Sequence, residues 1–335
     1  MTNNKFEFRP YRRRFKPPLQ TNHGIWDVRD GIIIRLTDEI GGVGYGEIAP
    51  VSWFGSETIE QALNFCHQLP NEITEKTIFS IPDELPACQF GFESAREDLK
   101  AEEAEEAEKD LGDKENASHP SPLTYSALLP AGDAALHEWR ILWDQGYRTF
   151  KWKIGVYPIA VELKIFELLT QVLPVSAKLR LDANGGLNYD EANLWLYRCD
   201  NIAAVPVEIE FIEQPLSVEQ FEKMQELSYC YATAIALDES IATLAQLETC
   251  YQNNWRGIFV IKPSILGSPQ RLRQFFQTNK IDAVFSSVFE TTVGRQAALR
   301  LATQLSHNHR AVGFGVNQWF EQNEEDWLEQ LWKDH

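Results

Sequence analysis

The sequence lacks the short motifs that mark several common classes of protein. Neither GxGxxG nor GxxxxGK[ST] occurs in its 335 residues, so a doubly wound sheet with a glycine-rich phosphate turn is not expected. Its five cysteines are an odd number without CxxC spacing, which argues against a disulfide framework and a thiolate zinc site. We therefore expect reduced, buried thiols.

Positive charge and long apolar runs are also scarce. There are 31 Lys and Arg against 49 Asp and Glu, and the net charge of -18 repels nucleic acid phosphates and anionic membrane surfaces. No segment approaches the length of a membrane span, and no apolar stretch of signal-peptide length follows the basic N-terminus. We expect a soluble, cytoplasmic protein whose partner is a small molecule, not nucleic acid or a membrane.

The first part of the chain has the pattern of a small α+β domain. β-branched and aromatic residues between turn dipeptides predict three antiparallel strands, over 5–15, 30–36 and 43–48. Helical periodicity then predicts helices over 57–68 and 90–108. An acidic stretch that ends in linker composition places a domain boundary near residue 118.

Beyond this boundary, short apolar strands alternate with amphipathic helices. Eight such strands are predicted, and each except the last is followed by helix-like sequence. The alternation predicts an α/β fold, a (β/α)8 TIM barrel over 119–313 with the α+β unit over 1–118 as a capping domain. We expect the segment 314–335 to return to the capping domain.

Charged residues stand at the ends of successive barrel strands, where this architecture builds its active sites. Asp182, Glu213, Asp238 and Lys262 follow one another at 31, 25 and 24 residues, each about one βα unit. Three converging carboxylates repel one another, and a hard divalent cation neutralises them. We predict Mg²⁺, with Mn²⁺ as a substitute, held by the three acids. The alternative for each acid taken alone is a helix cap or an ion pair.

Two lysines flank Trp152 on the second barrel strand. Period-two alternation sends Lys151 and Lys153 into the barrel and Trp152 outward against the helices. Facing, partly desolvated ammonium groups lower each other's proton affinity, so Lys153 is the candidate general base. The alternative for Lys151 is an ion pair with a metal-site carboxylate. Proton abstraction beside a carboxylate gives an enediolate, and Lys262 is expected to stabilise it or to act as a second base.

These motifs resemble a known superfamily. KWK, LDAN, FIEQP, ALDES and VIKPS are similar to the enolase superfamily in its muconate-lactonising branch, and GYGEIAPVSWFGSET resembles the capping domain of that branch. Within the branch, the chain most resembles the o-succinylbenzoate synthases. The resemblance implies Mg²⁺-dependent dehydration of 2-succinyl-6-hydroxy-2,4-cyclohexadiene-1-carboxylate on the way to menaquinone or phylloquinone. It implies that Lys153 removes the proton and assists loss of the hydroxyl, and that Lys262 stabilises the enediolate.

Substrate contacts are expected from the strand ends and from two capping loops, over 17–24 and 49–55. The resemblance implies contacts from Arg180, Asn184, Ser286, Ser287 and Gly313. The capping loops offer Trp53 and Phe54 as shields against water, with His23 as a further candidate. The alternative for both aromatic residues is packing at the domain interface.

Other functions remain open. N-succinylamino-acid racemases of this branch share nearly the same residues and use Lys262 as a second base. Dipeptide epimerases carry Asp-x-Asp after the final strand, where this chain reads GFGVNQWF. A non-enzymatic alternative is a metal-stabilised scaffold barrel, which the complete set of five charged positions disfavours. The sequence leaves the oligomeric state open between a monomer and a small homo-oligomer.

Overall fold

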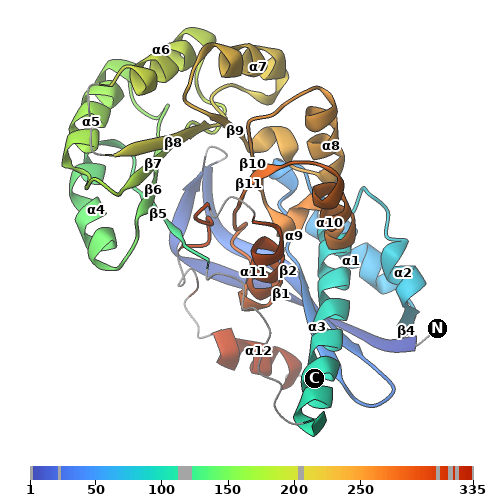
Figure 1. The fold of residues 1–335 in the computed structure, drawn as a ribbon. Coiled ribbons are helices and arrows are strands. Elements are labelled where there is room, and N and C mark those ends of the chain that lie inside the picture. Colours follow the sequence, from blue (N-terminus) through green and yellow to red (C-terminus); the bar gives the residue numbers. More distant parts are fainter. Residues whose placement is uncertain are drawn as a thin grey trace.

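The structure, a computed structural model, is built around two sheets, one antiparallel and one parallel (Figure 1). The predicted boundary near residue 118 falls outside the described part of the chain. Residue 22 and the candidate His23 also fall outside it. The described residues are 3–21, 24–111, 123–202, 207–306, 310–315, 320 and 324–333.

The antiparallel sheet comes from the N-terminal part of the chain and has the order β3–β2–β1–β4. The three predicted strands are present and the first two are longer than expected. A fourth short strand was not predicted. The strands are β1 (Asn3–Thr21), β2 (Gly24–Thr37), β3 (Val43–Ile48) and β4 (Glu72–Thr74).

The predicted loop over 17–24 is wrong for residues 17–21, which continue β1, and for Gly24, which begins β2. The pairing of β1 with β2 shifts register between Arg14 and Leu19 and then resumes to Thr21. An irregularity of this kind lets a strand continue past residues that cannot donate to the ladder, here the two prolines at 17 and 18.

Helices cover one face of this sheet, and their apolar side chains form a core with it. The long α3 lies directly on β3, because Gly46 has no side chain and a Cβ there would collide with the carbonyl oxygen of Gly91. The short α2 was not predicted. The elements are η1 (Ser52–Phe54), α1 (Ile59–Gln68), α2 (Glu75–Phe79) and α3 (Pro86–Leu111).

Seven parallel strands follow in chain order around the second sheet. The predicted eighth strand is reduced to a short segment in which Val312 bridges to Tyr125 and Gly313 to Ser286, joining the first strand to the last. The strands are β5 (Ser126–Leu129), β6 (Thr149–Lys153), β7 (Lys178–Asp182), β8 (Glu208–Glu213), β9 (Ile235–Leu237), β10 (Ile258–Ile261) and β11 (Asp282–Phe285).

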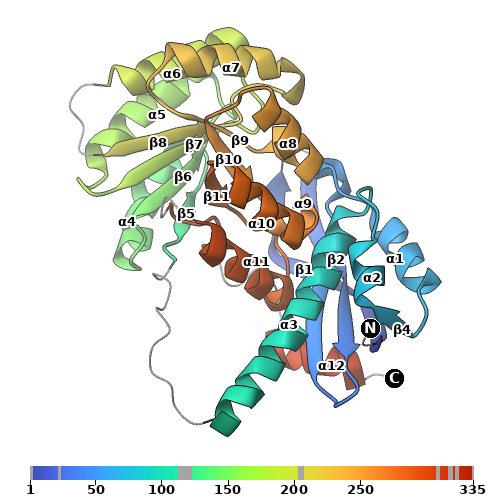
Figure 2. The ribbon, with the colours of Figure 1, turned by 45° about the vertical axis from the view of Figure 1, so that its right-hand side comes forward.

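Helices surround the outer face of the parallel sheet (Figures 1 and 2). None of the described helices is both long and apolar enough to cross a membrane. The elements are η2 (Gly132–Ala134), α4 (Ala135–Asp144), α5 (Ile159–Val172), α6 (Tyr189–Asp200), η3 (Val218–Gln220), α7 (Phe221–Cys230), η4 (Glu239–Ile241), α8 (Leu244–Gln252), α9 (Pro263–Leu266), α10 (Pro269–Thr278) and α11 (Thr292–Leu305).

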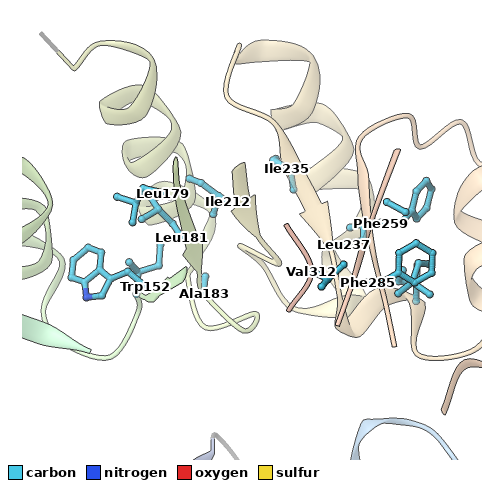
Figure 3. Packing of buried hydrophobic residues seen from close by; sticks show 14 of the residues in the cluster. Trp152, Leu179, Leu181, Ala183, Ile212, Ile235, Leu237, Phe259, Phe285 and Val312 are labelled. Atoms are coloured by element: carbon cyan, nitrogen blue, oxygen red, sulfur yellow. The ribbon is translucent and has the colours of Figure 1, made fainter. Parts of the chain in front are cut away.

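The side chains between strands and helices form the larger core. Trp152, Leu179 and Leu181 belong to this layer (Figure 3). The Trp152 ring is fully buried and meets Trp195 of α6 edge-on, with ring centroids 6.3 Å apart. Because neighbouring residues of a strand face opposite sides, this packing turns the lysines on either side of Trp152 into the barrel.

The end of the chain returns to the first sheet (Figure 1). Helix α12 (Glu324–Lys333) packs against β1, where Trp327 meets Tyr11 edge-on at 5.2 Å between ring centroids. The guanidinium of Arg13 lies 4.3 Å from the Trp327 ring centroid. This contact ties the described part of the C-terminal segment to the antiparallel sheet.

The buried Glu47 of β3 connects the domain of the antiparallel sheet to the domain of the parallel sheet. Its carboxylate accepts hydrogen bonds from the backbone amides of Thr291 and Gly294, at 3.0 and 2.9 Å, and from the Tyr11 hydroxyl at 2.5 Å. A carboxylate is favoured at the N-terminus of a helix, here α11. This contact fixes the first domain over the barrel.

All five cysteines are unpaired, and four of them are buried as expected. The prediction of burial is wrong for Cys230, which is exposed. Cys230 is the last residue of α7, and the buried residues of this helix are Met224 and Leu227.

Candidate active site

A cavity of about 770 Å³ lies between the capping domain and the carboxyl ends of the barrel strands. Apart from His23, which lies outside the described residues, the structure brings every predicted site residue to its wall. They come from eight different segments of the chain, which only the fold assembles. These residues are Trp53, Phe54, Lys151, Lys153, Arg180, Asp182, Asn184, Glu213, Asp238, Lys262, Ser286, Ser287 and Gly313.

Lys151 lies among the carboxylates. Its Nζ is 2.7 Å from Oδ2 of Asp182 and 2.9 Å from Oε1 of Glu213. Burial alone would lower the pKa of Lys151, but Asp182, Glu213 and Asp238 outweigh it and raise the pKa well above its usual range. The expected lowering of proton affinity therefore does not occur at Lys151, which stays a cation.

Two of the three acids are crowded and deeply buried. Burial raises the pKa of Glu213 to about 7, with a further contribution from Asp182 and opposition from Lys151. Burial likewise raises the pKa of Asp238 to about 6, against the effect of Lys262. The carboxyl ends of the barrel strands, called the barrel mouth below, thus hold more buried carboxylates than the nearby cations can keep at their usual pKa.

The chemistry of this donor set fits a hard divalent cation. Asp182, Glu213 and Asp238 offer carboxylate oxygens from the ends of three adjacent strands, and oxygen donors are what Mg²⁺ prefers. Within the described ranges, no three acids, histidines or cysteines are already close enough to form a complete metal centre. The carboxylates instead pair with Lys151 and Lys262.

Glu239 adds further negative charge that sequence reasoning did not assign to the site. Its Oε1 accepts from Nδ2 of Asn184 at 3.3 Å, while its buried Oε2 has no hydrogen-bond partner. Asn184 has a left-handed backbone, with φ 44°, and its amide donates to Oδ1 of Asp182 at 3.1 Å. The Asp-Glu pair after β9 was the available signal in the sequence.

The other two lysines approach the cavity from different sides. Lys153 ends β6 and stands opposite Asp182 in the strand register. Lys262 follows β10, and three strands separate β6 from β10 in the sheet. The Lys262 ammonium pairs with Oδ1 of Asp238. A substrate between the two lysines therefore has a cationic or basic group on each side.

Arg180 lies one layer below the carboxylates, almost fully buried. Its Nε donates to Glu210 at 2.7 Å, Glu210 also accepts from Arg310 at 2.6 Å, and Arg310 pairs with Asp282 through two bonds of 2.7 and 2.8 Å. This chain of ion pairs crosses the barrel interior. Nη2 of Arg180 has no hydrogen-bond partner, and Arg180 lines the cavity, so its substrate contact stays a prediction.

Ser287 holds the loop after β11 in addition to lining the cavity. Its hydroxyl donates to Glu290 at 3.0 Å and accepts from the amide of Phe289 at 2.9 Å. Ser286 bridges to Gly313 at the barrel seam. The role of these residues as substrate contacts stays a prediction.

The wall on the capping side is aromatic. Trp53 is 43% exposed, and its ring meets Trp26 at 5.6 Å between centroids. Trp26 in turn meets Phe289 of the barrel at 5.7 Å. Sequence reasoning missed Trp26 and Phe289, because no local pattern shows that β2 and the loop after β11 meet. Trp53 and Phe54 thus take part in domain packing and also face the cavity.

Comparison with known proteins agrees with this geometry. Residues 134–331 match the family described as enolase C-terminal domain-like, and residues 19–99 match the MenC N-terminal domain. An o-succinylbenzoate synthase of Thermosynechococcus vestitus is 38% identical over 319 residues, covering 94% of this chain and 93% of that protein. The chain belongs to the o-succinylbenzoate synthase family. The predicted family and fold class are confirmed, and the chain is a lyase.

Solved structures support the same assignment. The o-succinylbenzoate synthase of Thermosynechococcus elongatus BP-1, complexed with Mg in the active site, aligns with a TM-score of 0.85 at 36% identity, over 99% of this chain and 100% of that chain. The L-Ala-D/L-Glu epimerase of Bacillus subtilis aligns with a TM-score of 0.78 at 20% identity, over 96% of this chain and 92% of that chain. The second likeness shows a shared fold.

Proposed function

We propose that this chain dehydrates 2-succinyl-6-hydroxy-2,4-cyclohexadiene-1-carboxylate to 2-succinylbenzoate, as a step towards menaquinone or phylloquinone. The observation that carries the proposal is the convergence of two lysines from opposite sides and three carboxylates on one cavity. The relative with 38% identity supports the choice of substrate. The catalytic domain is a barrel over 119–313, and a capping domain over 1–118 closes it. The segment 314–335 belongs with the capping domain.

Lys153 is the group that moves the proton. It takes the proton from the carbon beside the substrate carboxylate, and the resulting ammonium returns a proton to the departing hydroxyl. The electron pair of the broken C–H bond becomes the new π bond that completes the aromatic ring, while the C–O bond breaks with its electron pair on the oxygen, which leaves as water. One residue that acts first as base and then as acid suffices for this reaction.

Lys262 holds positive charge on the other side of the substrate. Negative charge moves onto the carboxylate oxygens when the proton leaves, and a cation already in place lowers the barrier without reorganisation. Lys262 is paired with Asp238 at the mouth and is only 14% exposed, so its charge is little screened by water.

Asp182, Glu213 and Asp238 are the residues that would hold Mg²⁺, and Mn²⁺ would substitute for it. When bound, the cation supplies positive charge beside the substrate carboxylate. Lys151 pairs with Asp182 and Glu213 and orients both carboxylates.

Turnover by the purified full chain tests the proposal. With Mg²⁺ present, we expect the protein to convert the cyclohexadiene substrate to the aromatic product. The change in ultraviolet absorbance measures this conversion. Chelation with EDTA should abolish turnover, and added Mg²⁺ should restore it. A folded protein that does not convert the substrate with Mg²⁺ contradicts the function, and full turnover in EDTA contradicts the metal assignment.

A further inference from the structure

The capping domain makes a direct contact with one of the two lysines at the mouth. The Lys262 ammonium lies over the face of the Phe54 ring, 4.1 Å from the ring centroid. Phe54 belongs to η1 of the capping domain, whereas Lys262 follows a barrel strand. A cation over a ring face is attracted by the negative quadrupole of the ring, more strongly when both are partly withdrawn from water.

We propose that Phe54 is a positioning residue for Lys262, whose ring face holds the ammonium where charge develops on the substrate. The inference rests on the proposed function, since it concerns the charge that Lys262 supplies. It assigns Phe54 a task that depends on the π face of its ring. Shielding of the substrate depends only on the bulk of the side chain.

The loop that carries Phe54 is held rigidly. The Phe54 amide donates to the Val51 carbonyl at 2.9 Å, and the Val51 amide donates to the Ser56 hydroxyl at 2.7 Å. Glu57 then accepts from the amides of Ala87 and Cys88, at 3.0 and 2.8 Å, at the start of α3. The backbone that carries the ring is therefore tied to the framework of the capping domain.

Gly55 brings this loop against the barrel mouth. Its φ of 125° lies in the left-handed region that favours glycine, and a Cβ there would come 2.9 Å from Cβ of Ala242. Ala242 directly follows η4, the turn that begins after Asp238. The absence of a side chain at Gly55 therefore allows the loop that carries Phe54 to lie directly against the barrel.

The Lys262 ammonium needs a second contact besides its ion pair with Asp238, because Asp238 has another proposed partner. The backbone of Lys262 is fixed, since its carbonyl accepts from the amides of Ile265 and Leu266, both at 3.1 Å. Its side chain is a flexible four-carbon stem, and Asp238, its ion-pair partner, is also a proposed metal ligand. When Asp238 turns towards another cation, the Phe54 ring still attracts the ammonium.

Variants that separate the ring face from the bulk give the kinetic test. Phe54→Leu keeps an apolar side chain but removes the ring, so kcat for dehydration should fall roughly two- to thirty-fold while KM changes less. Phe54→Tyr keeps the face and should restore kcat. Trp53→Leu is the matched change in the neighbouring ring and should act mainly on KM. Equal kcat in the Leu and Tyr variants would overturn the proposal.

A double-mutant cycle in EDTA tests the contact without activity. Urea unfolding of wild type, Phe54→Leu, Lys262→Met and the double variant should show a coupling factor of roughly two- to thirty-fold in the unfolding constant. Phe54→Met replaces Phe54→Leu if the latter does not fold. Additive effects would overturn the contact. If the wild-type protein does not dehydrate the substrate, the proposed function is contradicted. Coupling in the unfolding constant would then show that the contact exists but has no role in that reaction.

Discussion

The Lys151 ammonium lies 2.7 Å from the carboxylate of Asp182, which belongs to the neighbouring strand. This pair separates the roles of two lysines that are only two positions apart. Lys151 is committed to the carboxylates and remains charged, whereas Lys153 at the end of the same strand faces the substrate space. This division is the reason why we propose Lys153 as the general base.

Replacing Lys153 with alanine should lower the rate of dehydration by roughly 10²- to 10⁴-fold, the contribution typical of a general acid–base group. Steady-state kinetics of Lys153→Ala measure this loss. Lys164→Ala is the matched control, because Lys164 is exposed on α5, and it should leave the rate unchanged. Intact dehydration by Lys153→Ala would contradict the mechanism.

Replacing Lys151 with methionine should destabilise the protein in EDTA by about 3–5 kcal/mol, because two buried carboxylates lose their counter-charge. Urea unfolding measures this difference, and added Mg²⁺ should recover part of it. Lys178→Met removes an ion pair with Glu208 that is 43% and 60% exposed, and should cost less than about 1 kcal/mol. Similar costs for both variants would show that Lys151 is not a buried counter-charge.

Trp53→Ala should raise KM for the cyclohexadiene substrate more than it disturbs folding. The ring is 43% exposed, so it contributes little to the core, yet it forms part of the cavity wall. Kinetics and thermal unfolding of the same preparation compare the two effects. An unchanged KM would assign Trp53 to domain packing alone.

The ion pairs across the barrel predict a pH-dependent contribution to stability. Burial favours the neutral form of Glu210, but Arg180 and Arg310 outweigh burial and hold its pKa below the usual 4.5. A lowered carboxyl pKa stabilises the fold above about pH 4.5 and less as the pH falls below it. Arg310→Gln should therefore cost about 3 kcal/mol at pH 7 and progressively less towards pH 3.

Urea unfolding of wild type and Arg310→Gln across this range measures the difference. The carboxylates at the mouth titrate in both proteins, so they cancel in the comparison. A cost that stays constant from pH 7 to pH 3 would show that Arg310 does not act through the charge of Glu210.

The sequence predicts much of the barrel and of its charged mouth. Parallel strands present their carboxyl ends at one face, so Asp182, Glu213 and Asp238, each about one βα unit apart, had to meet there. Trp152 sets which way its neighbours face, because an indole between two lysines is far more stable in the core. These features depend on local pattern and on chain order.

Contacts between distant segments could not be predicted. The Phe54 ring meets Lys262, and Trp26 meets Phe289, only because the capping domain docks on the barrel in one orientation. The ion pair of Lys151 with a carboxylate, in contrast, was an alternative that the sequence offered, and the structure shows it with Asp182 and Glu213. The continuation of β1 through two prolines was missed because a register shift, invisible in the sequence, accommodates them.

The comparison of two reactions tests the central claim most directly. The wild-type protein with Mg²⁺ is assayed for kcat/KM in dehydration of the cyclohexadiene substrate and in racemisation of an N-succinylamino acid in D₂O. We predict that dehydration dominates and that little of one amino-acid enantiomer is converted to the other, because one base suffices for dehydration and racemisation needs two. Racemisation that exceeds dehydration would contradict the account.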